Sequence, residues 1–304
     1  MTRTRPGRAA VLSLVGLLVA ACGGPAPVPV EGTAAPVAVD WRVETPEAWK
    51  FYAASEAARA PGGMVATDAR IATDVGVAVL EAGGNAVDAA VATGFALAVV
   101  YPVAGNIGGG GFAVVRLADG TTASLDFREK APGAAHRDMY LDENGEVSSD
   151  AVVGHRAAGV PGSPAGLWEL HQRFGSLPWE DVVRPSIELA RDGFVADADF
   201  AGAAADERLA RFAGSAALFQ PGGTPIAEGD TWANPDIADV LERMVADGPT
   251  GFYEGPTADL IVAEMERGGG LITHEDLQAY EAVWRDPVVF DYRGHEVVSM
   301  PPPS

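Results

Sequence analysis

Serine, histidine and carboxylate side chains are the residue types in this 304-residue sequence that most often carry acyl-transfer or acid–base chemistry. Ser163 stands in the pentapeptide GSPAG, and glycines flank the nucleophilic serine in the tight turn of many hydrolases. Here the first glycine has the wrong offset for that turn, and Pro164 directly follows the serine. We therefore interpret Ser163 as the cap of a helix rather than as a nucleophile.

The histidines and the single cysteine do not form a recognisable metal site. The five histidines are far apart, and none lies in an HExxH or comparable pattern; they are His136, His155, His171, His274 and His295. One cysteine cannot form an internal disulfide or a thiolate metal site. The 42 Asp and Glu residues are scattered, so no acid–base pair of the glycosidase type can be assigned. We expect no metal site.

A glycine-rich stretch, GNIGGGG, occupies residues 105–111. By count alone, Gly108, Gly110 and Ala113 fit a dinucleotide-binding fingerprint. That fingerprint needs a strand before the glycines and a helix after them, whereas this sequence predicts a helix before and a strand after. No lysine follows at the position that a phosphate-binding loop requires. We expect these glycines to let two backbones pass closely at the edge of a sheet.

Two strand-like runs follow the glycines, at residues 112–118 and 121–127, joined by an Asp-Gly pair that favours a two-residue hairpin turn. Asp126 and Arg128 share one face of the second strand, just where it ends. Composition alone favours a structural ion pair of Arg128 with Asp126 or with Glu129, because most exposed arginines near carboxylates form only solvated pairs.

Helices are expected on both sides of this hairpin in the sequence. The period of apolar residues predicts an amphipathic helix over residues 67–82. Asn85 is expected to cap a second helix that has Asp88 in its first turn and runs to Val100; this helix is apolar almost all round and should be buried. Further helices are predicted from Ser163 and over residues 179–191, 236–246, 256–267 and 273–280, with a second hairpin over residues 287–300.

The chain is strongly acidic, with 42 acidic and 21 basic residues and a net charge of −21. That charge gives no electrostatic reason to approach a phosphate backbone, so nucleic acid is not expected as a partner. With 48% hydrophobic and 21% charged residues, the chain can build a large core. The pattern is globular over residues 62–304, without an internal repeat or a clear domain break.

The N-terminus has the features of an export signal. Arginines precede an apolar run over residues 9–21 that is too short to span a bilayer. The run ends, after small residues, at Cys22; this resembles the lipobox of bacterial lipoproteins. We therefore expect a lipoprotein signal peptide over residues 1–21 and a lipid on Cys22, with an ordinary signal peptide and an incidental cysteine as the alternative.

The segment that follows the cysteine is rich in Pro, Ala and Gly over residues 22–61, which is typical of an extended tether. Gly23, rather than an aspartate, follows Cys22. We expect a periplasmic protein that is anchored by its lipid to the outer membrane.

Seven segments of the chain, in order, resemble the large-subunit half of γ-glutamyltranspeptidases. They are GMVA (63–66), GGNAVDAA (83–90), NIGGGGF (106–112), DFRE (126–129), ARDG (190–193), GGLIT (269–273) and SMPPPS (299–304). This resemblance implies a mixed α/β fold: the large-subunit half of the αββα sandwich of N-terminal-nucleophile hydrolases.

The same resemblance implies a reaction. In the family, a precursor cuts itself before a threonine, whose hydroxyl attacks the γ-glutamyl amide of glutathione and related compounds. The acyl group then passes to water or to an amino acid or peptide acceptor. No cofactor or metal is implied, and the implied partner is a small subunit from the same precursor.

The sequence departs from the family pattern at its end. The family continues beyond the PPPS segment and reaches the nucleophilic threonine later, whereas this chain stops at Ser304. We therefore expect a truncated product or a fragment that is inactive alone, and we assign no catalytic residue within it. The alternatives are a non-catalytic periplasmic lipoprotein that binds an amino acid or peptide, and a sibling acylase, such as a cephalosporin acylase, on the same scaffold.

Arg128 is the one residue that the resemblance places in contact with substrate. It occupies the position of the family arginine that holds the α-carboxylate of the γ-glutamyl group. A guanidinium suits that role because it makes two parallel charge-assisted hydrogen bonds to a carboxylate. The resemblance thus favours substrate binding over the structural ion pair.

Overall fold

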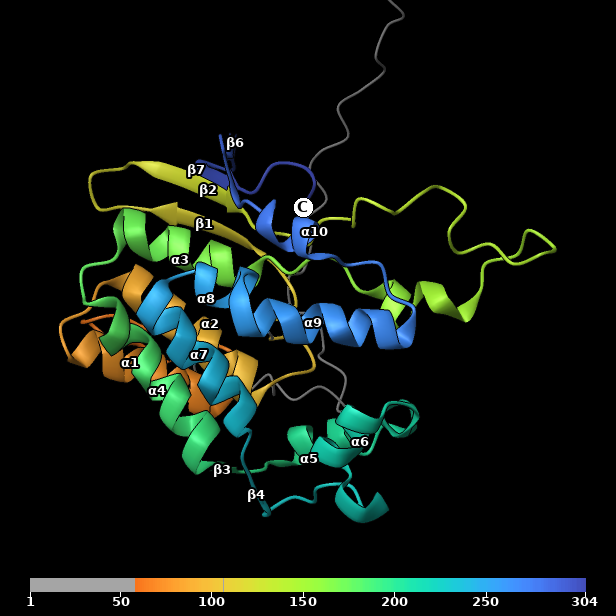
Figure 1. Ribbon diagram of the computed structural model, residues 1–304. Helices are drawn as coiled ribbons and strands as arrows, with labels where there is room; N and C mark the ends of the chain where they lie inside the picture. Colours follow the sequence, from red (N-terminus) through yellow and green to blue (C-terminus); the bar gives the residue numbers. More distant parts are fainter. Residues whose placement is uncertain (1–57, 106) are drawn as a thin grey trace, which may run out of the picture. The chain divides into compact units, whose positions relative to one another are not determined.

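The computed structural model describes residues 58–105 and 107–304, and every described helix and strand lies in the compact unit Arg59–Ser304 (Figure 1). The predicted signal peptide, Cys22 and the predicted tether up to residue 57 lie outside the described residues. Within the described ranges, no helix is both long enough and apolar enough to cross a membrane.

The first two helices match the prediction. α1 (Arg70–Glu81) packs against α2 (Ala86–Val100), and α2 packs in turn against α3 and α4. Asn85 caps α2: its side chain accepts hydrogen bonds from the first turn, and Asp88 accepts one back from the Asn85 N–H. Phe95, in the middle of α2, is fully buried, which confirms the prediction of a buried helix.

Further helices extend this layer. They are α3 (Ser163–Phe174), α4 (Trp179–Asp192), α7 (Pro235–Asp247), α8 (Thr250–Tyr253), α9 (Gly255–Gly268) and α10 (His274–Gln278). α4 packs against α7, α7 against α8, and α8 against α9, so consecutive helices lie side by side. Thr273 and Asp276 form the predicted capping box at the start of α10.

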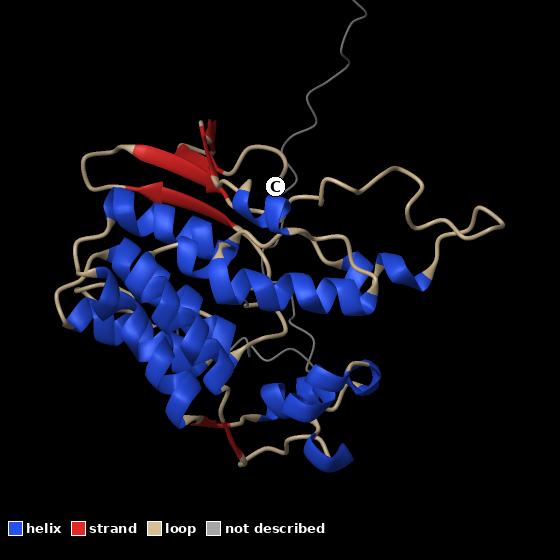
Figure 2. Cartoon of the chain, in the orientation of Figure 1, coloured by secondary structure: helices blue, strands red, loops and turns tan. Residues whose placement is uncertain are grey.

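An antiparallel sheet lies on one side of the helical layer (Figure 2). Its strands are β1 (Phe112–Arg116), β2 (Thr122–Asp126) and β5 (Val283–Arg285), with β2 in the middle. α3 packs against β2. The hairpin β1–β2 was predicted, whereas β5 was not, because three residues carry no detectable period. Its pairing with β2 brings Arg285 close to Asp126.

Two further pairs of strands complete the described part of the chain. The hairpin β6 (Val288–Tyr292) and β7 (His295–Ser299) confirms the second predicted hairpin. β3 (Phe194–Val195) pairs with β4 (Thr231–Trp232) and brackets a segment that the sequence did not predict. That segment contains the short helices α5 (Ala198–Ala204) and α6 (Ala213–Phe219) and the 3-10 turns Glu207–Arg211 and Pro221–Gly223.

The prediction that Ser163 caps α3 is wrong. Gly162 is the N-cap residue, and no side chain caps the helix. The N–H groups of Gly162 and Ser163 instead donate to the Gly109 carbonyl, at N···O distances of 2.7 and 3.0 Å. The glycine-rich segment therefore pairs N–H groups at the start of α3 that have no partner within the helix.

Candidate functional site

The glycine-rich segment lies directly against the backbone of Arg128. Gly111 exchanges hydrogen bonds with Phe127 on β2's side of the hairpin, with N···O distances of 3.2 and 3.0 Å. A Cβ on Gly110 would lie 2.5 Å from the Phe127 carbonyl oxygen and 2.7 Å from the Glu129 nitrogen, closer than real side chains approach. This confirms the prediction that the glycines allow a close backbone approach at a sheet edge.

The start of α3 closes the same segment from another side. A Cβ on Gly162 would lie 1.9 Å from the Phe127 carbonyl oxygen, and one on Gly166 would lie 2.1 Å from the Phe127 ring. Residues 127–129 are thus enclosed by glycines from two separate parts of the chain. We call Gly110, Gly111, Gly162 and Gly166 the glycine cradle.

Hydrogen bonds fix the Arg128 backbone at both of its polar groups. Its N–H donates to Asp126 Oδ1 at 3.1 Å, and its carbonyl oxygen accepts from the Tyr280 hydroxyl at 2.9 Å. The other oxygen of Asp126 accepts from Arg285 Nε at 2.8 Å and forms an ion pair with Arg285 Nη2, also at 2.8 Å. Asp126 is therefore engaged by Arg285, so it does not form the ion pair with Arg128 that composition alone favours.

The Arg128 side chain is exposed and has spare hydrogen-bonding capacity. Its Nη1 donates to the Pro303 carbonyl oxygen at 3.1 Å, and no carboxylate of the described residues lies within ion-pair distance of it. Glu129, the other partner that composition suggests, is also exposed and does not pair with it. A guanidinium has five N–H donors, so most of them remain available.

Arg128 lines a pocket of about 310 Å³. Its lining residues are Asp126, Arg128, Glu129, Lys130, Val283, Arg285 and Pro303. Of the basic residues, Arg285 is paired with Asp126, and Lys130 donates through Nζ to the Glu281 carbonyl oxygen at 2.8 Å. Arg128 and Lys130 thus line the pocket without a carboxylate partner in the described ranges, and a small anionic group would find its counter-charge there.

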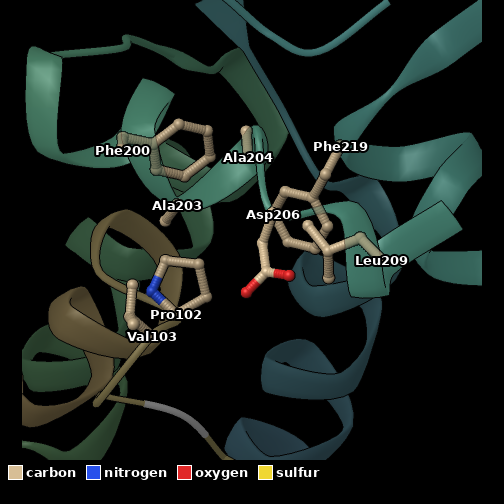
Figure 3. A pocket seen from close by; sticks show the side chains of 8 residues that line it. All are labelled: Pro102, Val103, Phe200, Ala203, Ala204, Asp206, Leu209 and Phe219. Atoms are coloured by element: carbon tan, nitrogen blue, oxygen red, sulfur yellow. The ribbon is translucent and has the colours of Figure 1, made fainter. Parts of the chain in front are cut away.

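Another pocket, of about 220 Å³, has a different character (Figure 3). It lies between the turn after α2 and the α5–α6 segment and is lined mainly by apolar side chains, Phe200 and Phe219 among them. Its one charged side chain, Asp206, is paired with Arg208, and that pairing lowers the pKa of the Asp206 carboxyl to about 2. Because its charge is already neutralised, this pocket offers no comparable site for a charged substrate.

The histidines stay apart in the fold. His155 Nε2 lies 2.7 Å from Glu264, and His274 Nε2 lies 2.9 Å from Asp259. His171 Nε2 bonds the Leu177 carbonyl oxygen at 2.9 Å. Among the described residues, His, Cys, Asp and Glu form no group of three that would suit a metal ion.

Sequence reasoning singled out Arg128 but missed its immediate supports. Arg285 and Tyr280 are more than 150 positions from Arg128 in the chain, and each acts through one hydrogen bond or ion pair. A lone arginine in a three-residue strand and a tyrosine after a short helix carry no spacing signal. Only the pairing of β5 with β2 and the position of α10 bring them to this site.

Comparison with known proteins identifies the family. The model for the family described as gamma-glutamyltranspeptidase matches residues 72–304. The chain belongs to the γ-glutamyltranspeptidase family. The glutathione hydrolase proenzyme of Escherichia coli strain K12 is 48% identical to it over 250 residues, which cover 81% of this chain and 43% of that protein.

A solved structure and an acylase extend the comparison within the γ-glutamyltranspeptidase family. The crystal structure of Helicobacter pylori γ-glutamyltranspeptidase has a TM-score of 0.80 and 43% identity, and covers 82% of this chain and 72% of that chain. The acylase ACY 1 proenzyme of Pseudomonas sp. strain V22 is 39% identical over 86% of this chain and 49% of that protein. The chain thus spans less than half the length of these curated relatives. The structural likeness confirms the predicted fold class, the mixed α/β fold of this N-terminal-nucleophile hydrolase family.

Proposed function

We propose that this chain is the large-subunit part of a γ-glutamyltranspeptidase. The enzyme would cleave the γ-glutamyl amide of glutathione and related compounds and transfer the γ-glutamyl group to water or to an amino acid or peptide acceptor. A small subunit from the same precursor would supply the threonine nucleophile and its oxyanion donors. Membership of the family and the names of its proenzyme relatives support this proposal.

The observation that carries the proposal is the state of Arg128. Its backbone is held at both polar groups, while the residue lines a pocket and its guanidinium has no carboxylate partner among the described residues. A fixed backbone with a free, planar fork is what orientation of a substrate carboxylate requires. We infer that Arg128 binds the α-carboxylate of the γ-glutamyl donor.

Replacing Arg128 by lysine tests this role in the complete two-subunit enzyme. Arg128→Lys keeps the charge and loses the bidentate fork, so we expect the KM for a γ-glutamyl anilide to rise at least ~10-fold, or about 1.4 kcal/mol, while self-cleavage proceeds. Arg184→Lys is the matched control, because Arg184 is exposed and pairs with Glu180 and Asp181 on α4. A donor KM that is the same in both variants would return Arg128 to a structural role.

The acylase alternative rests on the likeness to ACY 1 and is decided by substrate preference. Purified enzyme should hydrolyse a γ-glutamyl amide with a kcat/KM well above that for the side-chain amide of a cephalosporin. The reverse preference would assign the chain to the acylases of the family. Binding of an amino acid or peptide without any turnover by the complete protein would favour the non-catalytic lipoprotein.

We also propose that the protein works outside the cytoplasm, in the periplasm and anchored by a lipid on Cys22. The support is the apolar run over residues 9–21 that ends in small residues before Cys22. After expression in a Gram-negative host, mass spectrometry should find a diacylglycerol-modified Cys22, and Cys22→Ala should release the protein from membranes. A soluble mature form that begins at another residue would contradict the anchor.

A further inference from the structure

A tyrosine hydroxyl holds the backbone of Arg128 from the side of α10. Tyr280 follows α10 by two residues, and its hydroxyl donates to the Arg128 carbonyl oxygen at 2.9 Å. The Tyr280 side chain is buried and does not line the pocket, whereas Arg128 is exposed and does. The hydroxyl therefore touches the residue that presents the guanidinium without reaching the space where a substrate would lie.

We propose that Tyr280 is a positioning residue for the γ-glutamyl donor. By fixing the Arg128 carbonyl, the hydroxyl sets the direction in which the guanidinium enters the pocket. This inference rests on the proposed function, because it needs Arg128 to be the ligand of the donor carboxylate. Tyr280 itself makes no contact with substrate.

The Tyr280 ring is held rigidly enough to act in this way. It stacks on Tyr253, with ring centroids 5.6 Å apart and planes only 3° from parallel. The Tyr253 hydroxyl donates to the Pro161 carbonyl oxygen at 2.8 Å, which ties the stack to the residues just before α3. A Cβ on Gly162 would lie 2.2 Å from the Tyr280 hydroxyl oxygen, so the absence of a side chain there makes room for the hydroxyl.

The residues after Arg128 are attached to the same α10 segment. Lys130 Nζ lies 4.9 Å from the centroid of the Tyr280 ring and donates to the Glu281 carbonyl oxygen at 2.8 Å. The Gly133 N–H donates to Asp276 Oδ1, inside α10, at 2.7 Å. The hydroxyl bond to Arg128 is thus one of several ties between the α10 segment and residues 128–133, and the others keep the segment in place without it.

The hydroxyl keeps its proton over the working range of pH. Burial raises the pKa of the Tyr280 hydroxyl, and the negative charges of Asp126 and Glu129 raise it further. The group therefore remains a donor to the Arg128 carbonyl. Any effect of removing it should be constant between about pH 6 and pH 9, below the ordinary pKa of tyrosine.

The test is Tyr280→Phe in the complete two-subunit enzyme, which removes the hydroxyl and keeps the ring and its stack. We expect the KM for a γ-glutamyl anilide to rise about 3- to 10-fold, the size expected for one hydrogen bond, with kcat changed less than 2-fold. The ratio of KM values should not change with pH over the range above.

Tyr140→Phe is the matched control. The Tyr140 hydroxyl also donates to a backbone carbonyl, that of Arg156, at 2.9 Å, and neither residue lines the pocket. A purely structural role for Tyr280 predicts that both variants lower the melting temperature and leave the donor KM unchanged. That result, or a Tyr280→Phe protein that no longer folds, would overturn the inference.

A double variant separates this inference from the proposed function. If Tyr280 acts through Arg128, adding Tyr280→Phe to Arg128→Lys should raise the donor KM by less than 2-fold more, because the fork that it orients is already gone. Additive effects would place the action of Tyr280 elsewhere and contradict the inference alone. An unchanged donor KM in Arg128→Lys itself would instead contradict the proposed function.

Discussion

Gly162 is the residue with the least room for change in the glycine cradle. A Cβ there would lie 1.9 Å from the Phe127 carbonyl oxygen and 2.2 Å from the Tyr280 hydroxyl oxygen. Gly162→Ala must therefore displace backbone, and overpacking of this kind costs about 1–3 kcal/mol. We expect urea denaturation to show a loss of unfolding free energy in that range.

Gly202→Ala is the control for this prediction, because there the same substitution should raise the free energy of unfolding instead of lowering it. It lies inside α5, is exposed, and a Cβ there would meet no atom within 4 Å. Replacing a glycine inside a helix by alanine stabilises the folded protein by up to about 1 kcal/mol. If Gly162→Ala were as stable as Gly202→Ala, the backbone around the glycine cradle would be able to shift and accommodate a Cβ at little cost.

At the scale of an element, α2 depends on one buried carboxylate. Asp88 is fully buried and accepts from the Asn85 N–H at 2.8 Å, the Ser176 hydroxyl at 2.6 Å and N–H groups of Ser176 and Leu177 at 2.9 and 3.3 Å. It thus joins the start of α2 to the loop between α3 and α4. Asp88→Asn puts an NH₂ group among these donors. We expect it to lower the free energy of unfolding by about 2–3 kcal/mol at neutral pH.

This loss should depend on pH with a definite sign. Burial alone would raise the pKa of the Asp88 carboxyl, but the hydrogen bonds from Ser176, Asn85 and Leu177 outweigh it, so the pKa lies below its ordinary value. The carboxylate then stabilises the fold fully above the unfolded-state pKa of about 3.9 and less as the pH falls through the folded-state value. Urea unfolding at several pH values should show the gap between Asp88→Asn and the parent closing below about pH 4.

Asp286→Asn is the control for Asp88→Asn, because Asp286 is exposed in the turn between β5 and β6. It should change the unfolding free energy by less than about 0.5 kcal/mol at every pH. An Asp88→Asn gap that stayed constant down to about pH 3 would show that the charge of Asp88 is not what stabilises α2.

Elements with a strong local signal were predictable from the sequence, and those made by distant pairing were not. The Asn85–Asp88 and Thr273–Asp276 capping boxes and the hairpins were visible because their partners are neighbours in sequence. β5 exists only because β2 offers it a hydrogen-bonding edge. The α5–α6 segment has no regular period, and aromatic contacts such as that of Phe219 with Trp232 hold it together instead.

The candidate site divides in the same way. Arg128 was found through a local motif, and the close approach at the glycine-rich stretch through the order of helix, glycines and strand. The supports of Arg128 could not be found, since composition offered only Asp126 and Glu129, its neighbours in sequence, as partners. In the structure Asp126 pairs with Arg285, which lies on a strand that the sequence did not predict. Asp126 therefore does not occupy the guanidinium of Arg128, which stays available.

At the scale of the whole molecule, the hairpin β6–β7 exposes apolar side chains and, among the described residues, an unpaired strand edge. All residues of β6 are exposed, and the apolar and aromatic side chains of Val288, Val289, Phe290 and Tyr292 are between 41% and 55% exposed. In the described ranges β6 pairs only with β7, so its other edge has unpaired N–H and C=O groups. Such an edge is a template for a strand of another chain.

We therefore predict that this chain, expressed alone, self-associates through β6 despite its net charge of −21. Val289→Lys places a charge on the apolar edge and should shift sedimentation-velocity profiles toward the monomer at the same concentration. Leu260→Lys makes the same change of charge at an apolar side chain on α9 that is 67% exposed, so any general effect of charge appears in both variants. Only the strand variant should reduce association, because only β6 can add a strand; equal profiles for the two variants would show that association does not use this edge.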